Sequence, residues 1–360
     1  MSLSVEQLRA LPKVALHDHL DGGLRPQTVV DHCLENGHEP PTRDADALAD
    51  WFFEHADSGS LVNYLTTFDH TVAAMQTREQ LVRVAREFVL DQAADGVVLA
   101  EARWAPEQHL QRGLTMAEAI EAVRDGLAEG MTQAAEKGTP VIAHQIVTSM
   151  RHGEPTLDVA ELAVRYRNDS VCGFDIAGAE KGFPPSRMAA AFDYLKRQNA
   201  YFTIHAGEAF GLPSIWEAVQ VCGAHRLGHG VRIVEDISVD ESGGDVLGPL
   251  ADYIRNQRIP LEVCPSSNLQ TGIADSIAEH PVELLKRLKF RVTISCDNRL
   301  QSRTTLSREF ALCSEAFGWS VDDVRWLTIN AAKSAFLPFD QRLRLIDEVI
   351  KPGFAAAGAS

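Results

Sequence analysis

The sequence predicts a single α/β domain built as a (β/α)8 TIM barrel, with a helical insertion after its first strand. Short apolar runs rich in Val, Ile and Leu alternate with helical patterns along the chain. Eight such runs occur in 360 residues, which suits a barrel with insertions. No stretch rich in Pro, Gly or Ser divides the chain, so one domain is expected over residues 1–350.

The predicted strands are short and contain β-branched residues, as expected of parallel strands that are buried on both faces. In order they are Val14–Leu20, Val97–Trp104, Pro140–Val147, Val171–Ile176, Tyr201–His205, Arg226–His229, Pro260–Cys264 and Arg291–Cys296. Helical patterns lie between or after them at Met116–Lys137, Val159–Tyr166, Ser186–Arg197, Ser214–Cys222, Val246–Arg255, Pro281–Leu288 and Thr305–Phe317. An open doubly wound sheet is the alternative, but no glycine-rich phosphate turn follows an early strand.

The connection between the first two predicted strands is much longer than one crossover helix requires. It contains helical patterns at Thr28–Glu35, Ser60–Met75 and Glu79–Ala94. In the second of these, apolar residues recur at helical spacing, namely Leu61, Tyr64, Leu65, Phe68 and Val72. An insertion at this point lies over the C-terminal face of a barrel, so we expect residues 28–95 to pack there and to form a lid. The small, weakly apolar residues 351–360 predict a flexible tail.

The composition excludes several classes of protein. Lys and Arg number 34 against 50 Asp and Glu, a net charge of -16, which argues against binding to nucleic acid. No run of apolar residues is long enough to span a membrane, and the first residues lack a signal-peptide pattern. The six cysteines form no C-x-x-C pair and predict buried free thiols. A cytoplasmic protein is therefore expected, with neither nucleic acid nor membrane as a partner.

Residues that bind metals or transfer protons gather at the ends of four predicted strands. His17 and His19 end the first strand and, being two residues apart, point the same way. His205 and Glu208 follow the fifth strand, His229 ends the sixth, and Asp297 follows the eighth. The carboxyl ends of barrel strands meet at one rim, so these side chains are expected to converge in one pocket.

A buried group of this kind is costly unless a cation neutralises it. Three imidazoles and one carboxylate suit zinc and leave room for a water. Two further groups, Glu208 and His229, would then be free to move protons. The alternative for any single histidine is a hydrogen-bonded core residue.

Other charged groups have structural interpretations. Glu101 and Arg103 share one face of the second strand, and we expect them to form an interior ion pair. The acidic run Glu235–Asp245 predicts a solvated helix entry. Arg151 and His152 follow the third strand and are candidates for the edge of the pocket.

Several motifs together resemble the adenosine deaminase family. They are Leu-Pro-Lys-Val-Ala-Leu-His-Asp-His-Leu-Asp-Gly at 11–22, Phe-Asp-Ile-Ala-Gly-Ala-Glu at 174–180, His-Ala-Gly-Glu at 205–208, Gly-His-Gly at 228–230 and Thr-Ile-Ser-Cys-Asp at 293–297. The segment Asn330–Phe336 is similar to the C-terminal helix of that family. Each motif is modest alone, but their order and spacing are highly specific.

The resemblance implies one zinc ion per chain, bound by His17, His19, His205 and Asp297. It implies hydrolytic deamination of adenosine to inosine, and of 2′-deoxyadenosine to deoxyinosine, with release of ammonia, in purine salvage. Zinc would acidify a water that attacks purine C6. Glu208 would protonate N1, while His229 and Asp297 orient and deprotonate the nucleophile.

The resemblance also implies that His19, Asp21 and Gly178 meet the substrate, a small purine nucleoside, with Asp21 on the ribose side. The family usually has a second Asp after the metal-binding one, hydrogen-bonding purine N7, where this chain has Asn298. An amide NH₂ always donates, whereas a carboxyl must be protonated to do so. The departure therefore bears on fine specificity more than on the reaction.

Several alternatives remain open in the sequence. Two-metal relatives carry a bridging lysine after strand four, but Gly178 stands near that point and Lys181 comes three residues later. Adenine deaminases tend to have Glu where Asp21 stands. Nucleotides such as AMP or N6-methyl-AMP also remain open, because basic residues near the predicted rim could hold a phosphate, namely Arg25, Arg151, Lys181, Arg299 and Arg303. A silent barrel that only binds is disfavoured because every ligand and the acid are present. The sequence does not predict the oligomeric state.

Overall fold

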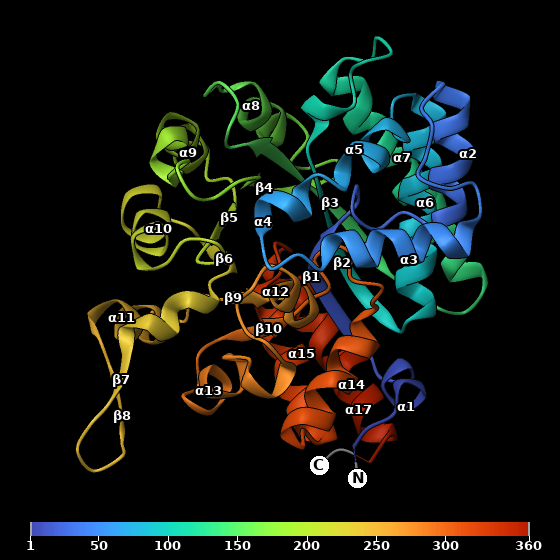
Figure 1. The fold of residues 1–360 in the computed structure, drawn as a ribbon. Coiled ribbons are helices and arrows are strands. Elements are labelled where there is room, and N and C mark those ends of the chain that lie inside the picture. Colours follow the sequence, from blue (N-terminus) through green and yellow to red (C-terminus); the bar gives the residue numbers. More distant parts are fainter. Residues whose placement is uncertain (1, 359–360) are drawn as a thin grey trace.

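The computed structural model describes residues 2–358, and parallel strands form its centre (Figure 1). Eight of them alternate with helices in the manner predicted. Their bounds are β1 (Lys13–His19), β2 (Val97–Trp104), β3 (Ile142–Met150), β4 (Val171–Ala177), β5 (Thr203–Ala206), β6 (Arg226–His229), β9 (Leu261–Val263) and β10 (Val292–Ile294). β2 and β6 match their predicted bounds, and the other six differ by one to three residues at one or both ends.

The strands form two four-stranded sheets that meet at both edges. The orders are β1-β2-β3-β4 and β10-β9-β6-β5, so neighbours follow the chain. One seam is a parallel bridge between Asp18 and Asp297, and the other joins Phe174 to Phe202. Across the first seam, the Asp297 N–H donates to the His17 carbonyl at 2.9 Å, and the His19 N–H donates to the Asp297 carbonyl at 2.7 Å. This arrangement agrees with the predicted (β/α)8 barrel.

Helices surround the strands in Figure 1. Most of the helices that follow β2 to β10 lie on the outside, α12 lies near the centre of the view, and α14, α15 and α17 lie close to the N-terminal α1. The bounds are α1 (Val5–Arg9), α7 (Met116–Glu136), α8 (Asp158–Arg165), α9 (Ala189–Arg197), α10 (Leu212–Trp216), α11 (Pro249–Asn256), α12 (Pro265–Gln270), α13 (Val282–Arg287), α14 (Leu306–Phe317), α15 (Val321–Ser334), α16 (Phe339–Arg344) and α17 (Lys351–Ala356). Shorter helical turns are η1 (Pro106–Gln108), η2 (Pro185–Met188), η3 (Glu217–Cys222), η4 (Val231–Asp236), η5 (Ile277–Glu279) and η6 (Leu345–Ile350).

The insertion between β1 and β2 is helical, as predicted. Its helices are α2 (Pro26–Asn36), α3 (Ala45–Ala56), α4 (Leu61–Leu65), α5 (Phe68–Ala73) and α6 (Arg78–Ala94). The predicted single helix over 60–75 is two helices, because the hydroxyls of Thr66 and Thr67 bond back to the carbonyls of Asn63 and Tyr64 at 2.7 and 2.8 Å. Such side-chain bonds compete with the helical backbone pattern. The helix α3, which Asp44 caps, was not predicted.

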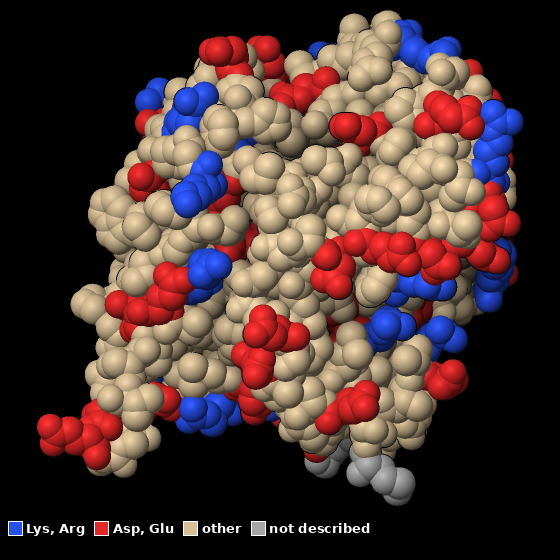
Figure 2. Space-filling view, in the orientation of Figure 1, with Lys and Arg blue, Asp and Glu red and all other residues tan. Residues whose placement is uncertain are grey.

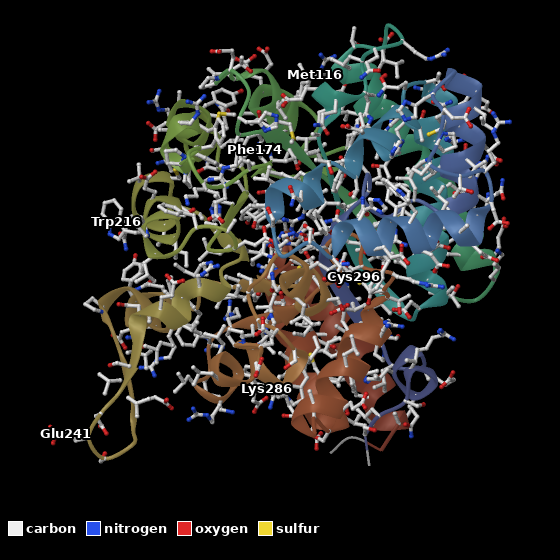
Figure 3. The ribbon with its side chains drawn as sticks, viewed as in Figure 1. Met116, Phe174, Trp216, Glu241, Lys286 and Cys296 are labelled. Atoms are coloured by element: carbon white, nitrogen blue, oxygen red, sulfur yellow. The ribbon has the colours of Figure 1, made fainter. Side chains whose placement is uncertain are left out.

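Two regions differ from the sequence prediction. The acidic run at 235–245 leads into an antiparallel hairpin of β7 (Ile237–Val239) and β8 (Asp245–Leu247), not into a helix entry. Figure 3 shows Glu241 at its tip, away from the body of the molecule. The predicted flexible tail is wrong for residues 351–356, which form α17 with Phe354 fully buried. Residues 359–360 lie outside the described chain.

The surface agrees with the acidic composition. On the face that Figure 2 shows, Asp and Glu are widely spread, and Lys and Arg occur in separate groups, several of them beside acidic residues. Among residues 2–358, no helix combines the length and the apolar character that crossing a membrane requires.

Candidate metal and catalytic site

A cavity of about 920 Å³ lies at the carboxyl ends of the strands. One part of its lining, which we call the floor, consists of His19, His205, Glu208, His229 and Asp297, and we include the adjoining buried His17 in it. Another part, which we call the mouth, consists of Leu61, Tyr64, Leu65, Phe68, Asp69, Val72 and Ala73 from the insertion, of Trp104 at the end of β2, and of residues 105, 107, 108, 110 and 111 after it. All five apolar residues that were predicted to share a helix face therefore line the cavity.

The floor contains a group of side chains that could hold a metal ion. His17, His205, His229 and Asp297 offer ligand atoms within 4.8 Å of one another, and residues 2–358 contain no other such group of three or more. His19 is close as well, since its Nε2 lies 3.3 Å from both His205 Nε2 and Asp297 Oδ1. The predicted convergence of β1, β5, β6 and the end of β10 is therefore present.

The spacing of these atoms suits a zinc ion that also keeps one position for a water. Neighbouring nitrogen and oxygen donors at about 2.0–2.2 Å from one zinc ion would lie about 3–3.5 Å from one another. Asp297 Oδ1 is 3.4 Å from His17 Nε2 and 3.3 Å from His19 Nε2. His17 Nε2 is buried and has no hydrogen-bond partner among the described residues. Buried polar atoms are rarely left without a partner, so this nitrogen is available as a metal ligand.

His229 faces this group from a different side. Its Nε2 lies 3.9 Å from Asp297 Oδ2, the other carboxylate oxygen, and 3.5 Å from Glu208 Oε2. Its position between the acid and the carboxylate suits proton transfer or orientation of a water better than it suits a fourth imidazole ligand.

Buried carboxylates orient two of the candidate ligands. Glu262 Oε2 lies 3.0 Å from His17 Nδ1, and Asp175 Oδ2 lies 2.9 Å from His205 Nδ1. With Nδ1–H donated to Glu262, the His17 imidazole turns the lone pair of Nε2 toward the centre of the group. The Asp175 carboxylate close to Nδ1 favours the same tautomer of His205. Burial lowers the pKa of His205 to about 4, which favours this neutral, ligating form despite the nearby Asp175.

A single guanidinium joins these two carboxylates. Arg103 donates to Asp175 at 2.9 Å and to Glu262 at 2.7 Å, and all three side chains are fully buried. Burial opposes ionisation of Glu262, but Arg103 and Arg226 hold its pKa well below the usual value. The predicted ion pair between Glu101 and Arg103 is wrong, because Glu101 pairs with Arg226 at 2.7 Å instead. The barrel interior contains enough carboxylates for each arginine to have partners on other strands.

The side chain of Glu180 fixes the loop that carries Glu208. The carboxylate of Glu180 accepts four backbone N–H groups, from Gly207, Glu208, Ala209 and Phe210, at 2.6–3.1 Å. Burial, together with the negative charges of Asp297 and Glu180, raises the pKa of Glu208 well above its usual value. This environment favours the protonated form of the carboxyl group, which can act as an acid.

The helix after β9 holds the side chains of Asp297 and His229. In α12, Ser267 Oγ donates to Asp297 Oδ2 at 2.6 Å, and Asn268 Nδ2 lies 3.0 Å from His229 Nδ1. His229 and Asp297 both have φ of 61°, in the left-handed region that favours glycine. Strain of this kind persists only where surrounding contacts impose it, and it gathers at functional sites.

The predicted substrate residues lie in the same cavity. Asp21, Gly178 and Asn298 line it together with His19. Gly178 has φ of 100°, and a Cβ there would lie 2.8 Å from His152 Nδ1, so only glycine fits. Gly22 makes room for Asn298, because a Cβ at Gly22 would lie 1.9 Å from Asn298 Oδ1.

The structure does not bring the five predicted phosphate-binding residues to the cavity. The part of its lining that lies within the described chain contains no Lys or Arg. Arg25 pairs with Asp91 at 2.6 Å, Arg299 pairs with Asp18 at 3.0 Å, and Arg303 pairs with Asp50. Arg151 is buried and donates to the carbonyls of Phe183 and His205 at 2.8 and 2.7 Å, and Lys181 is exposed. His152, the other candidate for the pocket edge, does line the cavity.

Sequence reasoning missed the residues that lie against the floor side chains or their loops, namely Asp175, Glu180, Glu262, Ser267 and Asn268. A signal exists for some of them. Glu262 is a charged residue in the middle of a strand that the sequence predicts to be buried on both faces. Ser267 and Asn268 follow that strand, at the same rim as the other site residues.

Comparisons with known proteins agree with this geometry. The family model for adenosine deaminase matches residues 12–352. Adenosine deaminase 1 of Streptomyces coelicolor is 60% identical over 353 residues, which cover 98% of this chain and 89% of that protein. Adenosine deaminase of Mycobacteroides abscessus is 55% identical over 354 residues, 98% of each chain. A zinc-bound amidohydrolase from Burkholderia ambifaria has a similar fold, with a TM-score of 0.83 at 23% identity over 99% of this chain and 95% of that one.

Proposed function

The chain belongs to the adenosine deaminase family, and we propose that its cavity uses one zinc ion to deaminate adenosine and 2′-deoxyadenosine. Water replaces the 6-amino group, so the products are inosine or deoxyinosine and ammonia. This reaction belongs to purine metabolism, where salvage is the expected role. The single observation that supports it most is that Glu208, a buried carboxyl group whose pKa burial raises, lies beside the histidine and aspartate group on the floor.

We assign the metal to His17, His19, His205 and Asp297. The 3.3–3.4 Å contacts among their donor atoms support this set, as does the unpartnered Nε2 of His17. A zinc ion there would supply a water that is acidic enough to react as hydroxide near neutral pH. Glu262 and Asp175 would keep His17 and His205 in the ligating tautomer. Glycine at position 178 supports one metal, since a bridging lysine is missing near that point.

Glu208 acts as the acid in this proposal. It donates its proton to purine N1, which makes C6 more open to addition. The raised pKa keeps the proton on the carboxyl group until N1 takes it. The bonds from Glu180 fix the backbone of the loop that carries Glu208.

His229 and Asp297 act on the attacking water. Both side chains face the space beside Glu208, and Ser267 holds the Asp297 carboxylate. Burial opposes ionisation of Asp297, but the imidazoles of His17, His19 and His229 beside its carboxylate keep its pKa well below the usual value. An ionised Asp297 can accept a proton from the nucleophile.

The remaining contacts orient the nucleoside. Asp21 lies on the ribose side, the Gly178 backbone approaches the base, and His19 borders both. Asn298 donates to purine N7 through its amide and needs no shifted pKa to do so. These assignments rest on the family resemblance and on the place of each residue in the cavity lining.

A nucleoside suits the cavity better than a nucleotide. The carboxylates Asp69 and Glu107 line the mouth and Asp21 lies in the same cavity, whose lining also includes His38 and His152. A phosphate dianion there would meet like charges with no arginine or lysine to pair with. Adenine, AMP and N6-methyl-AMP remain the alternative substrates, and a silent binding barrel is the alternative of another class.

The test is a substrate panel with and without a chelator. Turnover of adenosine, 2′-deoxyadenosine, adenine, AMP and N6-methyl-AMP is followed by the ultraviolet change on deamination, and zinc is counted per chain. We expect adenosine and 2′-deoxyadenosine to react fastest, one zinc per chain, and loss of activity on chelation. Preference for another member of the panel would reassign the substrate. A lack of turnover with any of them would favour the silent barrel.

A further inference from the structure

A chain of three buried side chains ends on the imidazole of His229. It starts at the backbone N–H of Val282, which donates to His280 Nδ1 at 3.0 Å. His280 Nε2 lies 3.2 Å from Asn268 Oδ1, and Asn268 Nδ2 lies 3.0 Å from His229 Nδ1. The three side chains belong to residues that are at most 3% exposed, so water does not interrupt the chain.

The direction of donation along this chain is fixed by its first member. A backbone N–H can only donate, so His280 Nδ1 must accept, and the neutral ring carries its proton on Nε2. Burial lowers the pKa of His280 to about 4, which keeps the ring neutral at physiological pH. The Nε2–H donates to Asn268 Oδ1, and the amide nitrogen is left to donate to His229 Nδ1.

The opposite arrangement is not compatible with the same contacts. A rotated Asn268 amide would place its NH₂ group against the Nε2–H of His280, so that two donors would face each other at 3.2 Å. Burying two unsatisfied donors costs about 1–3 kcal/mol for each. The polarity of the chain therefore follows from the Val282 N–H and not from the assigned orientation of the amide.

We propose that Asn268 and His280 are positioning residues that hold His229 as the tautomer with its proton on Nε2. His229 then presents a hydrogen-bond donor, and not a base, to the cavity. The tautomer follows from the hydrogen-bond chain alone, while its meaning for catalysis rests on the proposed function.

This tautomer changes the role of His229 in the reaction. A protonated Nε2 cannot accept the proton of the attacking water, but it can hold the oxygen of that water by donating to it. Asp297 Oδ2, which is 3.9 Å from His229 Nε2, is then the facing group that can take the proton. The family resemblance led us to expect that His229 and Asp297 together orient and deprotonate the nucleophile, and this inference divides the two tasks between them.

The tautomer can be read directly by NMR. Full-length, zinc-loaded protein is labelled with ¹⁵N-histidine, and the two ring nitrogens of His229 are assigned by loss of their signals in His229→Gln. We expect Nδ1 to show the shift of an unprotonated nitrogen and Nε2 that of a protonated one. The reverse pattern in the wild-type protein would overturn the proposal without any further variant.

Two substitutions give the tautomer a functional readout. A carboxylate can only accept, so Asn268→Asp should move the His229 proton to Nδ1 and lower kcat about 100-fold, with KM within about twofold. His280→Ala frees the amide to rotate and should give mixed tautomers and a kcat that is lower by about tenfold. An unchanged His229 spectrum in Asn268→Asp would contradict the proposal.

A matched control is available in His225. Its Nδ1 also accepts a backbone N–H, from Phe202 at 3.3 Å, but it does not contact Asn268. His225→Ala should therefore leave the His229 spectrum and kcat unchanged within about twofold. A fall in kcat for His225→Ala equal to that for His280→Ala would indicate a general structural effect and overturn the positioning role. A correct wild-type tautomer without turnover of any aminopurine would leave the tautomer standing and overturn the proposed function.

Discussion

At the floor of the cavity, most of the reacting side chains lie against a buried polar partner at 2.6–3.0 Å, whereas the mouth relies chiefly on apolar side chains. His17, His205 and His229 each have a neighbour that fixes the ring, namely Glu262, Asp175 and Asn268. At the mouth, Leu65, Phe68 and Val72 contribute side chains without polar atoms. A change at the floor should therefore affect the reaction steeply, while a change at the mouth should adjust which substrate enters.

Removal of the acid from the floor is the strongest test of this contrast. Glu208→Gln keeps the size of the side chain but removes the proton that N1 needs, so kcat should fall by about 10³-fold or more. Bound zinc should stay at one per chain, because Glu208 lies outside the proposed ligand set. Activity is measured with adenosine, and metal by elemental analysis.

The control is Glu235→Gln, at an exposed glutamate that pairs with Arg232 at 2.8 Å outside the cavity lining. It should keep kcat within about twofold. A Glu208→Gln enzyme with near wild-type turnover would remove Glu208 from the reaction.

The second test removes the guanidinium beneath the floor. Arg103→Met leaves Asp175 and Glu262 short of a buried partner, so the free energy of unfolding should fall by about 3–5 kcal/mol. Zinc affinity should fall by about 10–100-fold, because His17 and His205 lose their fixed orientation. Denaturant unfolding and chelator competition measure the two effects.

Arg303→Gln is the comparison for Arg103, because Arg303 pairs with Asp50 at the exposed surface. That change should cost less than about 1 kcal/mol. Equal costs for the two variants would mean that the buried network adds no more than a surface ion pair does.

A third test measures how the free energy of unfolding depends on pH through His280, which lies behind the floor in contact with Asn268. Burial lowers the pKa of His280 to about 4, below the value near 6.5 in the unfolded chain. Between these values the unfolded state binds more protons, so this contribution is complete above about pH 6.5 and falls by about 3 kcal/mol as pH drops toward 4. His280→Gln should flatten the pH slope of the unfolding free energy in that window.

The zinc ligands also titrate when the pH falls, so the informative quantity is the difference between the slopes of the wild type and His280→Gln. Parallel slopes would show that His280 titrates alike in the folded and unfolded states. That result would also remove the support that its neutrality gives to the hydrogen-bond chain.

The same contrast explains how much the sequence could predict. Period-2 spacing and strand ends are local patterns, and they were enough to bring His17, His19, His205, His229 and Asp297 to one rim. The orienting bonds join residues that lie far apart, such as Glu262 with His17 and Arg103 with Asp175. Local patterns show that such residues are buried but do not choose their partners, which is why Glu101 was paired with the wrong arginine.

The insertion also shows what a local sequence pattern can and cannot predict. The apolar spacing correctly selected the residues that line the mouth, because that spacing records which side is buried. It did not reveal the break between α4 and α5, which depends on the Thr66 and Thr67 hydroxyls. The sequence also did not show that Arg25, Arg299 and Arg303 pair with Asp91, Asp18 and Asp50 outside the cavity lining.

The smallest expected effect lies at the mouth and concerns charge alone. Asp69 is an exposed cavity residue at the start of α5, so Asp69→Lys removes a negative charge and adds a positive one where a 5′-phosphate would enter. We expect kcat/KM for AMP to rise about three- to tenfold, with adenosine unchanged within about twofold. Asp69→Asn should give a smaller rise, and added salt should reduce both gains because exposed charges are screened. If Asp69→Lys raised adenosine and AMP turnover equally, the mouth would control access in general, and its acidic charge would not be what separates nucleosides from nucleotides.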